Sequence, residues 1–253
     1  MGGPILRSAI ACLVTLLVPV LAHSFDVTGG SQVVPPRETG VLQVDLTACP
    51  SSAVGVFLSD RSELDLNGHA VASGAIGVHC FAKKCTVRGP GEIRNASLHG
   101  LLASYLNARV RVEDVDVHDN GSGGIVASAG KPRIIVERVT ARFNVVGIET
   151  IFKGRIYGED VDASNNAFNG IVAGGRFRFK RLTLLDTGVS EPGSSADGLV
   201  SLTSSGKLID SIVTGSTGAD LATFRRPKLV NSTCGTSRFV DPGGSTWGVC
   251  TND

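Results

Sequence analysis

Aromatic residues are scarce in this 253-residue chain, at 5% with a single tryptophan, whereas glycine is abundant with 32 residues. Such a composition suits short strands and tight corners better than helices. Net charge is also nearly absent, because 24 basic residues oppose 23 acidic ones. No bulk field therefore attracts nucleic acid or anionic membranes, and we expect no nucleic-acid partner.

Zinc-site spacing is missing as well, since no cysteine pair is separated by two residues and no histidine pair accompanies the cysteines. Export, argued below, permits disulfides, and we favour them over free thiols. Cys80 and Cys85 would close a loop at one corner, and Cys234 and Cys250 would attach the C-terminal tail. Cys49 is then left without a partner.

Long apolar runs are confined to the N-terminus. Residues 1–22 contain one basic residue, Arg7, followed by an apolar run and the small-residue site Val20-Leu21-Ala22. This order predicts a secretory signal peptide, too short for a membrane span, and hence a secreted or periplasmic protein with no transmembrane segment after cleavage. The alternative, a buried helix, is disfavoured because Pro4 and Pro19 bracket the run.

A repeat dominates the rest of the chain. Short apolar runs, most of them opened by a glycine, recur in steps of 22 to 28 residues, starting at Gly55, Gly77, Gly100, Gly124, Gly147, Gly170, Gly198 and Leu221. A second pattern recurs between them: alternating apolar residues, a two-residue interruption and alternation again, as in residues 109–117 and 133–141. These patterns predict stacked units, each with three short strands and one tight corner.

The repeat resembles the right-handed parallel β-helix of the pectin-lyase-like superfamily over residues 55–235. Its typical opening turn is matched by Leu64-Asp-Leu-Asn-Gly-His69, and its Asn-then-Gly-Ile junctions by Asn120, Asn144 and Asn166. Asparagine at such corners is expected to adopt the left-handed conformation and to hydrogen-bond along the stack. The resemblance implies an all-β, single-stranded right-handed solenoid of about seven to eight rungs of three strands. It implies no single function, because the scaffold carries lyases, hydrolases, epimerases, adhesins and non-catalytic coat proteins.

One domain is expected, because no linker or low-complexity tract interrupts the chain. After the leader at 1–22 we predict an N-terminal cap at 23–54 with a first strand at 41–46, the β-helix at 55–235 and a C-terminal cap at 236–253. A solenoid exposes its core and unpaired strand edges at both ends, so terminal segments must cover them. Phe239 and Trp247 are available as lids.

Several outward-facing columns follow from the repeat. In the glycine-led strand, the residue after the glycine points inward and the second residue after it points outward. The outward residues form the column His79, Leu102, Val126, Glu149, Val172 and Val200. We expect loops or a partner chain to cover this apolar strip; otherwise it would contact a sugar ring or another subunit, so an oligomer is compatible with it. At the corner, Glu113, Glu137, Glu159 and Lys180 are flanked by Asp114, Arg138, Asp160 and Arg181, whose charges alternate. A charge ladder that supports register is favoured there.

The acidic corner column would also suit calcium, although no cofactor is required by this interpretation. The like-charged column of Arg109, Arg133, Arg155 and Arg176 invites an anionic ligand or pairs with the acidic corner, and we favour pairing.

The third strand carries the residues most typical of an enzyme. Asp116 and Asp162 are two turns apart, about 9–10 Å, near the upper end of the separation in inverting glycosidases. His118 would serve as a general base, and Arg142 between the two acids would bind a uronate carboxylate. The adjoining turn offers Asp119, Asn165 and Asp186, and the longer loop from Asp186 to Asp197 would wall this face. The alternative is that these are solvated turn residues.

Family catalytic motifs are missing from the sequence. The Asn-Thr-Asp, Asp-Asp, Gly-His-Gly and Arg-Ile-Lys set of the pectin hydrolases does not occur, nor does the calcium-carboxylate and arginine set of a pectate lyase. Two hypotheses remain. The favoured one is an exported β-helix protein that binds a polysaccharide or another extracellular ligand on its lateral face. The alternative is a lyase, glycoside hydrolase or epimerase of acidic polysaccharide that uses the outward carboxylates of the third strand.

Overall fold

The computed structural model describes residues 24–50, 52–188, 196–203 and 206–240. Within these ranges every regular element is a strand, and the strands pair in parallel to form two sheets. The 14-stranded sheet contains β1 (Ser24–Val27), β3 (Thr39–Leu42), β4 (Leu46–Cys49), β6 (Ser62–Asp65), β7 (Ala70–Ser73), β9 (Lys84–Arg94), β11 (Arg109–His118), β13 (Arg133–Arg142), β15 (Arg155–Asp162), β17 (Phe177–Leu185), β19 (Lys207–Ile209), β20 (Ile212–Thr214), β22 (Lys228–Val230) and β23 (Thr233–Cys234). The 10-stranded sheet contains β2 (Gln32–Val34), β5 (Val54–Leu58), β8 (Ile76–Cys80), β10 (His99–Ala103), β12 (Gly123–Ala127), β14 (Val146–Thr150), β16 (Asn169–Ala173), β18 (Leu199–Ser201), β21 (Leu221–Thr223) and β24 (Ser237–Phe239).

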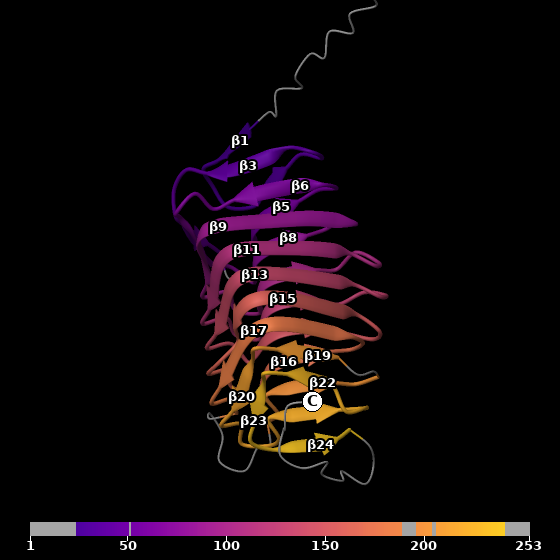
Figure 1. The fold of residues 1–253 in the computed structure, drawn as a ribbon. Coiled ribbons are helices and arrows are strands. Elements are labelled where there is room, and N and C mark those ends of the chain that lie inside the picture. The colour runs from indigo at the N-terminus through magenta and orange to yellow at the C-terminus, as the bar shows by residue number, and fades with distance from the viewer. Residues whose placement is uncertain (1–23, 51, 189–195, 204–205, 241–253) are drawn as a thin grey trace, which may run out of the picture.

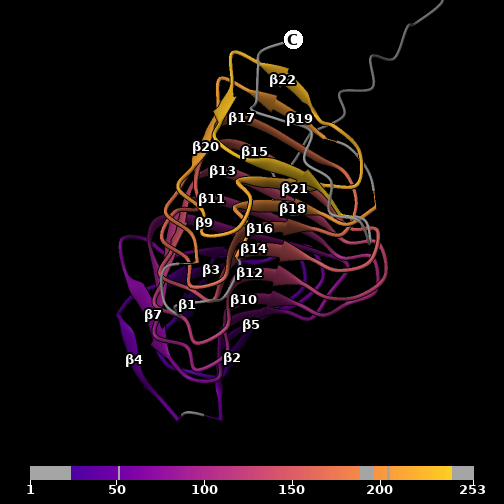
Figure 2. The same ribbon diagram turned by 90° about the horizontal axis from the view of Figure 1, so that it is seen from below.

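The strands stack along one axis as a parallel β-helix, which confirms the predicted fold class (Figure 1). From below, the two sheets lie on opposite sides of the coil (Figure 2). In the 10-stranded sheet, the glycine-led repeats correspond to the run from β5 to β21, and β2 and β24 extend the stack at its ends. In the segment predicted as an N-terminal cap, β1 to β4 pair with later strands. The first strand expected at 41–46 is instead divided between β3 and β4, because the chain turns a corner at Gln43 to Asp45.

Single residues in the left-handed conformation make the corner inside each long strand. Asp114, Arg138, Asp160 and Arg181 have φ angles of 58°, 51°, 54° and 56°, and the strand continues on both sides of each. The two strands predicted to meet here are therefore one bent strand. Its first part faces the viewer in Figure 1, and its second part forms a third face at the left-hand edge.

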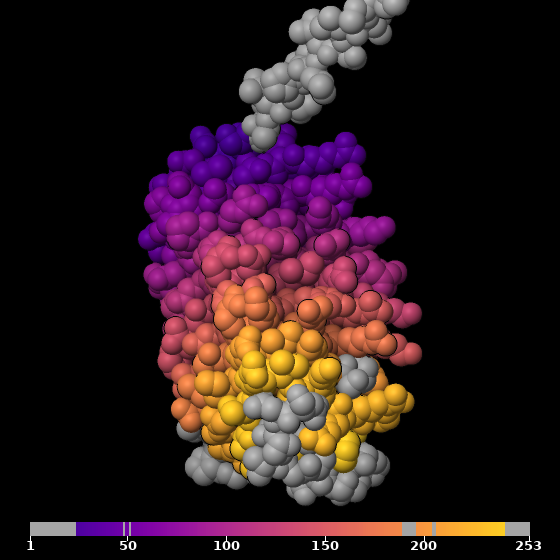
Figure 3. All heavy atoms as spheres, in the orientation of Figure 1, coloured from indigo at the N-terminus to yellow at the C-terminus, as the bar shows by residue number. Residues whose placement is uncertain are grey.

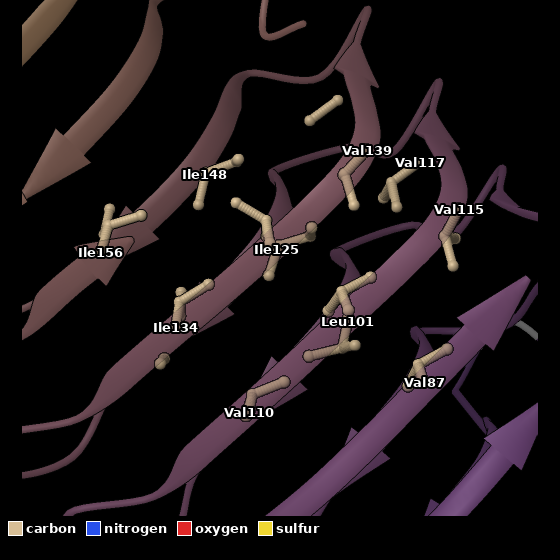
Figure 4. Close-up of a cluster of buried hydrophobic side chains, with 14 of the residues drawn as sticks. Val87, Leu101, Val110, Val115, Val117, Ile125, Ile134, Val139, Ile148 and Ile156 are labelled. Carbon is tan, nitrogen blue, oxygen red and sulfur yellow. The ribbon is translucent and has the colours of Figure 1, made fainter. Parts of the chain in front are cut away.

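Aliphatic side chains fill the centre of the coil. Val78, Leu101, Ile125, Ile148 and Ile171, which follow the repeated glycines, are all 0% exposed, so the predicted inward column is confirmed. Figure 4 shows Leu101, Ile125 and Ile148 among valines and isoleucines from the opposite sheet. Burial of each such side chain contributes about 1.5–3 kcal/mol to stability.

Close packing, rather than backbone freedom, explains the repeated glycines. A Cβ atom on Gly124 would lie 2.6 Å from the carbonyl oxygen of Gly147, and one on Gly147 would lie 2.5 Å from that of Gly170. The neighbouring asparagines hydrogen-bond along the stack as expected. The left-handed residue, however, is the one before each of them: Asp119, Phe143 and Asn165, with φ angles of 55°.

The predicted disulfide between Cys80 and Cys85 is present, with Cα atoms 6.0 Å apart. Cys234 is also disulfide-bonded, and Cys250, its predicted partner, lies outside the described residues. Cys49 is a free, half-buried thiol whose pKa is raised by burial. The predicted leader and Trp247 also lie outside the described residues.

Candidate functional site

A column of carboxylates runs along the third face of the coil. Parallel pairing places Asp116 between Glu92 and Thr140, and Thr140 beside Asp162. Neighbours in such a column are about 4.8 Å apart. Three of the four side chains are acidic, so three of these four consecutive turns present a carboxylate on this face.

Asp116 occupies a partly buried position in this column. Its Oδ1 atom is buried and has no hydrogen-bond partner among the described residues. Burial raises the pKa of Asp116, and Glu92 and Asp162 raise it further, whereas His118 and Arg142 oppose the shift. Asp116 therefore holds a proton more readily than an ordinary aspartate does.

The predicted base His118 lies between two carboxylates. Its Nδ1 atom is 2.7 Å from Oδ2 of Asp119, and its Nε2 atom is 3.8 Å from Oε2 of Glu92. The same Glu92 oxygen accepts a hydrogen bond of 2.8 Å from Nε of Arg94. These contacts fix the orientation of the imidazole ring above the acidic column.

Arg142 stands on the turn between those of Asp116 and Asp162, as the spacing predicted. Its Nε atom is 3.9 Å from Oδ2 of Asp162, while Oδ1 of that residue accepts a 3.0 Å hydrogen bond from the Ser164 amide. The guanidinium group is thus held loosely enough to accept an anionic or hydroxyl-bearing ligand.

Two adjoining clefts hollow this face, and together they form what we call the acidic groove. One has a volume of about 690 Å³ and includes Asp45, Glu92 and Asp116 in its walls. The other, of about 430 Å³, includes Asp162 and Thr183. Arg138 and Thr140 line both clefts, so the groove runs along the axis of the stack over several turns.

The predicted turn residues Asp119, Asn165 and Asp186 are the left-handed residues of the next corner. Phe143 occupies the same position on the intervening turn, with a φ angle of 55° and 56% of its surface exposed. Asn165 and Phe143 line a further cleft of about 500 Å³ beside the acidic groove. A bulky residue in this conformation is uncommon, because its Cβ approaches the backbone. The predicted wall at 186–197 lies mostly outside the described residues.

Glu92 is a groove residue that the sequence did not reveal. The β9 strand carries Gly89-Pro90-Gly91 at its corner, and the pairing of β9 with β11 shifts register between Glu113 and Val115. This insertion hid the repeat pattern, although Glu92-Ile-Arg94 has the same alternation as Asp116-Val-His118.

The charge ladder expected at the corner inside the long strands of the 14-stranded sheet is present. We call it the paired corner, and it consists of Asp114, Arg138, Asp160 and Arg181. Nη2 of Arg138 donates to Oδ2 of Asp114 at 2.9 Å, and Nη2 of Arg181 to Oδ2 of Asp160 at 2.7 Å. These hydrogen bonds hold the pKa values of both aspartates below their usual range. The ladder therefore neutralises itself.

The arginine column does not pair with the acidic corner, so this prediction is wrong. Arg111 contacts Glu113 and Glu137 instead, and Lys180 contacts Glu159. Among the described residues, no ion pair involves Arg109, Arg133, Arg155 or Arg176; Arg133 stacks over the Tyr157 ring, 4.7 Å from its centroid. The reason is position: Arg111 lies two residues closer to the corner than Arg109 and reaches the glutamates first.

The outward column of the glycine-led strands is partly covered. Val172, Val200 and Ala222 form a buried cluster, against which Val146 and Val240 pack. His79 donates to or accepts from Ser104 Oγ at 2.8 Å. Coverage by the chain itself therefore accounts for one end of this strip, as expected.

Cofactor and membrane features are few in the described part of the chain. It contains no group of three or more histidine, cysteine, aspartate or glutamate residues arranged to hold a metal ion. Nor does it contain a helix of the length and hydropathy needed to cross a bilayer.

Comparison with known proteins identifies no family for this chain. No family model matches the chain, and no curated protein matches it. Among solved structures, pectate lyase Pel9A superposes with a TM-score of 0.48 at 14% sequence identity, over 72% of this chain and 56% of the lyase. The chain thus spans about 56% of that structure.

Proposed function

We propose that the protein binds a linear polysaccharide along the acidic groove, outside the cytoplasm. The observation that carries the proposal is the shape of the groove, which follows the stack axis and presents Glu92, Asp116, Thr140 and Asp162 on consecutive turns. Carboxylates accept hydrogen bonds from sugar hydroxyls, and Arg94 and Arg142 donate to ring and hydroxyl oxygens. The Cys80–Cys85 disulfide supports export, in line with the leader expected from the sequence.

Isothermal titration against a panel of oligosaccharides tests this proposal. The panel consists of uncharged glucan and xylan fragments, whose hydroxyl groups can donate to the carboxylates of the groove. We expect one of them to bind, and expect Asp162→Asn together with Arg142→Gln to weaken binding by about tenfold or more. Arg37→Gln, at an exposed residue that lines neither cleft of the groove, serves as the control. Equal affinity of the groove variant and the wild type would remove the groove from the function.

Glycoside hydrolysis is the second candidate, and the adjacency of Glu92 and Asp116 favours it. Side chains on neighbouring strands are about 4.8 Å apart, close to the ~5–5.5 Å between the two carboxyl groups of retaining glycosidases. Asp116, with its raised pKa, would protonate the leaving oxygen, and Glu92 would attack the anomeric carbon. Water would then release the sugar from Glu92.

Reducing-end release from the bound glycan distinguishes catalysis from binding. Hydrolysis by the wild type, abolished in both Asp116→Asn and Glu92→Gln with binding intact, would establish the enzyme. Its rate should fall as pH rises through the pKa of Asp116, because only the protonated acid is competent. Binding without turnover at any pH would leave the protein as a binding module.

A further inference from the structure

The edge of the coil opposite the acidic groove is rich in positive charge from residue 81 onward, whereas the two turns before it carry Glu38 beside Arg37 and Asp60 beside Arg61. Here the chain passes from the 10-stranded sheet back to the 14-stranded sheet, through the segments 81–84, 104–109, 128–133, 151–155, 174–178 and 224–228. Every one of these segments contains lysine or arginine, and none contains aspartate or glutamate. We call this edge the basic corner. The balanced net charge of the whole chain conceals it.

Basic side chains at this corner are in register along the stack. Lys84 pairs with Arg109, Arg109 with Arg133, and Arg133 with Arg155, while Arg176 follows on the next turn. A parallel column of Arg178, Lys207 and Lys228 continues towards the C-terminal end. The positive charges therefore recur at the strand spacing of about 4.8 Å.

Like charges on directly opposed strand positions destabilise a sheet. The paired corner of the same strands avoids this cost by alternating Asp114, Arg138, Asp160 and Arg181. At the basic corner the sign never alternates over five consecutive turns. The paired corner is therefore neutral, whereas the basic corner keeps a column of positive charges without acidic neighbours. Such a column is suited to binding an external anion.

Exposed rings accompany the charges. Phe81, Tyr105, Phe152 and Phe224, each from a different segment of the basic corner, are 66%, 48%, 65% and 48% exposed. In Figure 1 these connections lie at the right-hand edge, where the strands of the 14-stranded sheet begin. Figure 3 shows side chains protruding from that edge turn by turn. Apolar ring faces between cations suit a ligand that has both flat faces and anionic groups.

We propose that the basic corner is a second binding site, for an acidic polysaccharide that lies along the stack axis. A chain of six-membered sugar rings advances by close to one strand spacing per ring, so successive carboxylates or sulfates meet successive arginines. Phosphates on one strand of duplex DNA follow each other every ~3.4 Å, which does not match the column. Guanidinium groups bind carboxylate and sulfate in a two-pronged geometry. The site is separate from the acidic groove, so one protein molecule would hold two glycan segments.

Binding measurements on two charge-matched double variants test the site. Arg109→Gln/Arg155→Gln removes two positive charges from the column, while Arg88→Gln/Lys180→Gln removes two from the same sheet outside it. Polygalacturonate and dextran sulfate are the anionic probes, with uncharged dextran and a duplex oligodeoxynucleotide as comparisons. Thermal unfolding verifies that each variant folds.

We expect the wild type to bind at least one anionic glycan and not dextran. The column variant should bind it about tenfold or more weakly, with a plot of log Kd against log salt that is shallower by about 1–2. The control variant should stay within about twofold of the wild type. Tighter binding of polygalacturonate would identify carboxylate as the preferred anionic group, and tighter binding of dextran sulfate would identify sulfate.

Three results would overturn the proposal. They are equal losses in both variants, absence of binding to either anionic glycan, and tighter binding of the oligonucleotide than of both glycans. A groove variant, Asp162→Asn/Arg142→Gln, should bind the anionic probe as the wild type does. Loss of binding in that variant would place the anion in the acidic groove and remove the second site.

Discussion

Two corners of the same coil are built from ladders of polar side chains, and they differ in whether water reaches them. At the amide corner, Asn120, Asn144 and Asn166 are at most 3% exposed, and Nδ2 of Asn120 donates to Oδ1 of Asn144 at 2.9 Å. At the paired corner, the side chains of Arg138 and Asp114 are 49% and 40% exposed. Identical spacing therefore gives a buried network in one place and solvated ion pairs in the other. Burial, not pairing, decides how much each ladder stabilises the fold.

The largest effect that would sharpen this comparison is expected for Asn144→Ala. Nδ2 of Asn144 donates to the carbonyls of Arg142 and Val117 at 2.9 and 3.1 Å, and its Oδ1 accepts from the Asn120 amide at 3.1 Å. Alanine leaves these buried groups unpaired, at about 1–3 kcal/mol each. We expect the free energy of unfolding to fall by about 3 kcal/mol, measured by urea denaturation.

Arg138→Gln is the matched change at the paired corner. It removes one ladder member that water can replace, so the urea midpoint should move far less than in Asn144→Ala. Similar shifts in the two variants would show that the exposed ladder contributes as much as the buried one, contrary to the comparison.

Charge reversal contrasts the paired corner with the basic corner. Arg138→Glu places a third acid beside Asp114 and Glu137 and should lower Tm by about 2–4 °C. Arg155→Glu places an acid between Arg133 and Arg176 and should leave Tm unchanged or raise it. The difference between the variants should shrink in ~1 M salt, where the Debye length is about 3 Å. Equal losses of Tm in both would mean that local charge does not distinguish the corners.

The repeat period predicts columns well because each turn adds one strand spacing, so inward and outward positions propagate along the chain. The inward position of Ile125, Ile148 and Ile171 and the register of Asp116 with Thr140 follow from it directly. Period alone does not say how far a side chain reaches around a corner. This is why Arg109 was expected at the glutamates that Arg111 contacts.

Local irregularities limited the prediction of the site. The Gly89-Pro90-Gly91 corner interrupts the alternation, so Glu92 was not aligned with Asp116 although the two residues are adjacent across strands. The sequence also does not show how deeply each carboxylate is buried, because burial depends on which neighbouring residues cover it. The raised pKa of Asp116 depends on that burial, which the sequence pattern does not encode.

A smaller effect is expected at the left-handed position between the amide corner and the acidic groove. Phe143 adopts a φ angle of 55°, where asparagine or glycine is favoured. Phe143→Asn should raise Tm by about 2–4 °C, measured by differential scanning calorimetry. Phe143→Ala, which also has a Cβ and no local hydrogen-bonding group, should give no such rise. A lower Tm in Phe143→Asn would show that ring contacts outweigh the backbone strain.

The smallest effect compares two carboxylates of opposite pKa shift. Burial raises the pKa of Asp116, so the folded protein keeps a proton that the unfolded chain releases near its ordinary value of ~3.9, and stability falls as pH rises from there through the raised pKa. The Arg138 hydrogen bond lowers the pKa of Asp114, so its contribution is present above ~3.9 and is lost as pH falls through the lowered pKa. Asp116→Asn should therefore raise Tm at about pH 7, and Asp114→Asn should lower it there. Near about pH 3 the effect of Asp116→Asn should vanish, because that carboxyl is then protonated in both states. A Tm change of the same sign in both variants at neutral pH would contradict the assignment of burial to one acid and pairing to the other.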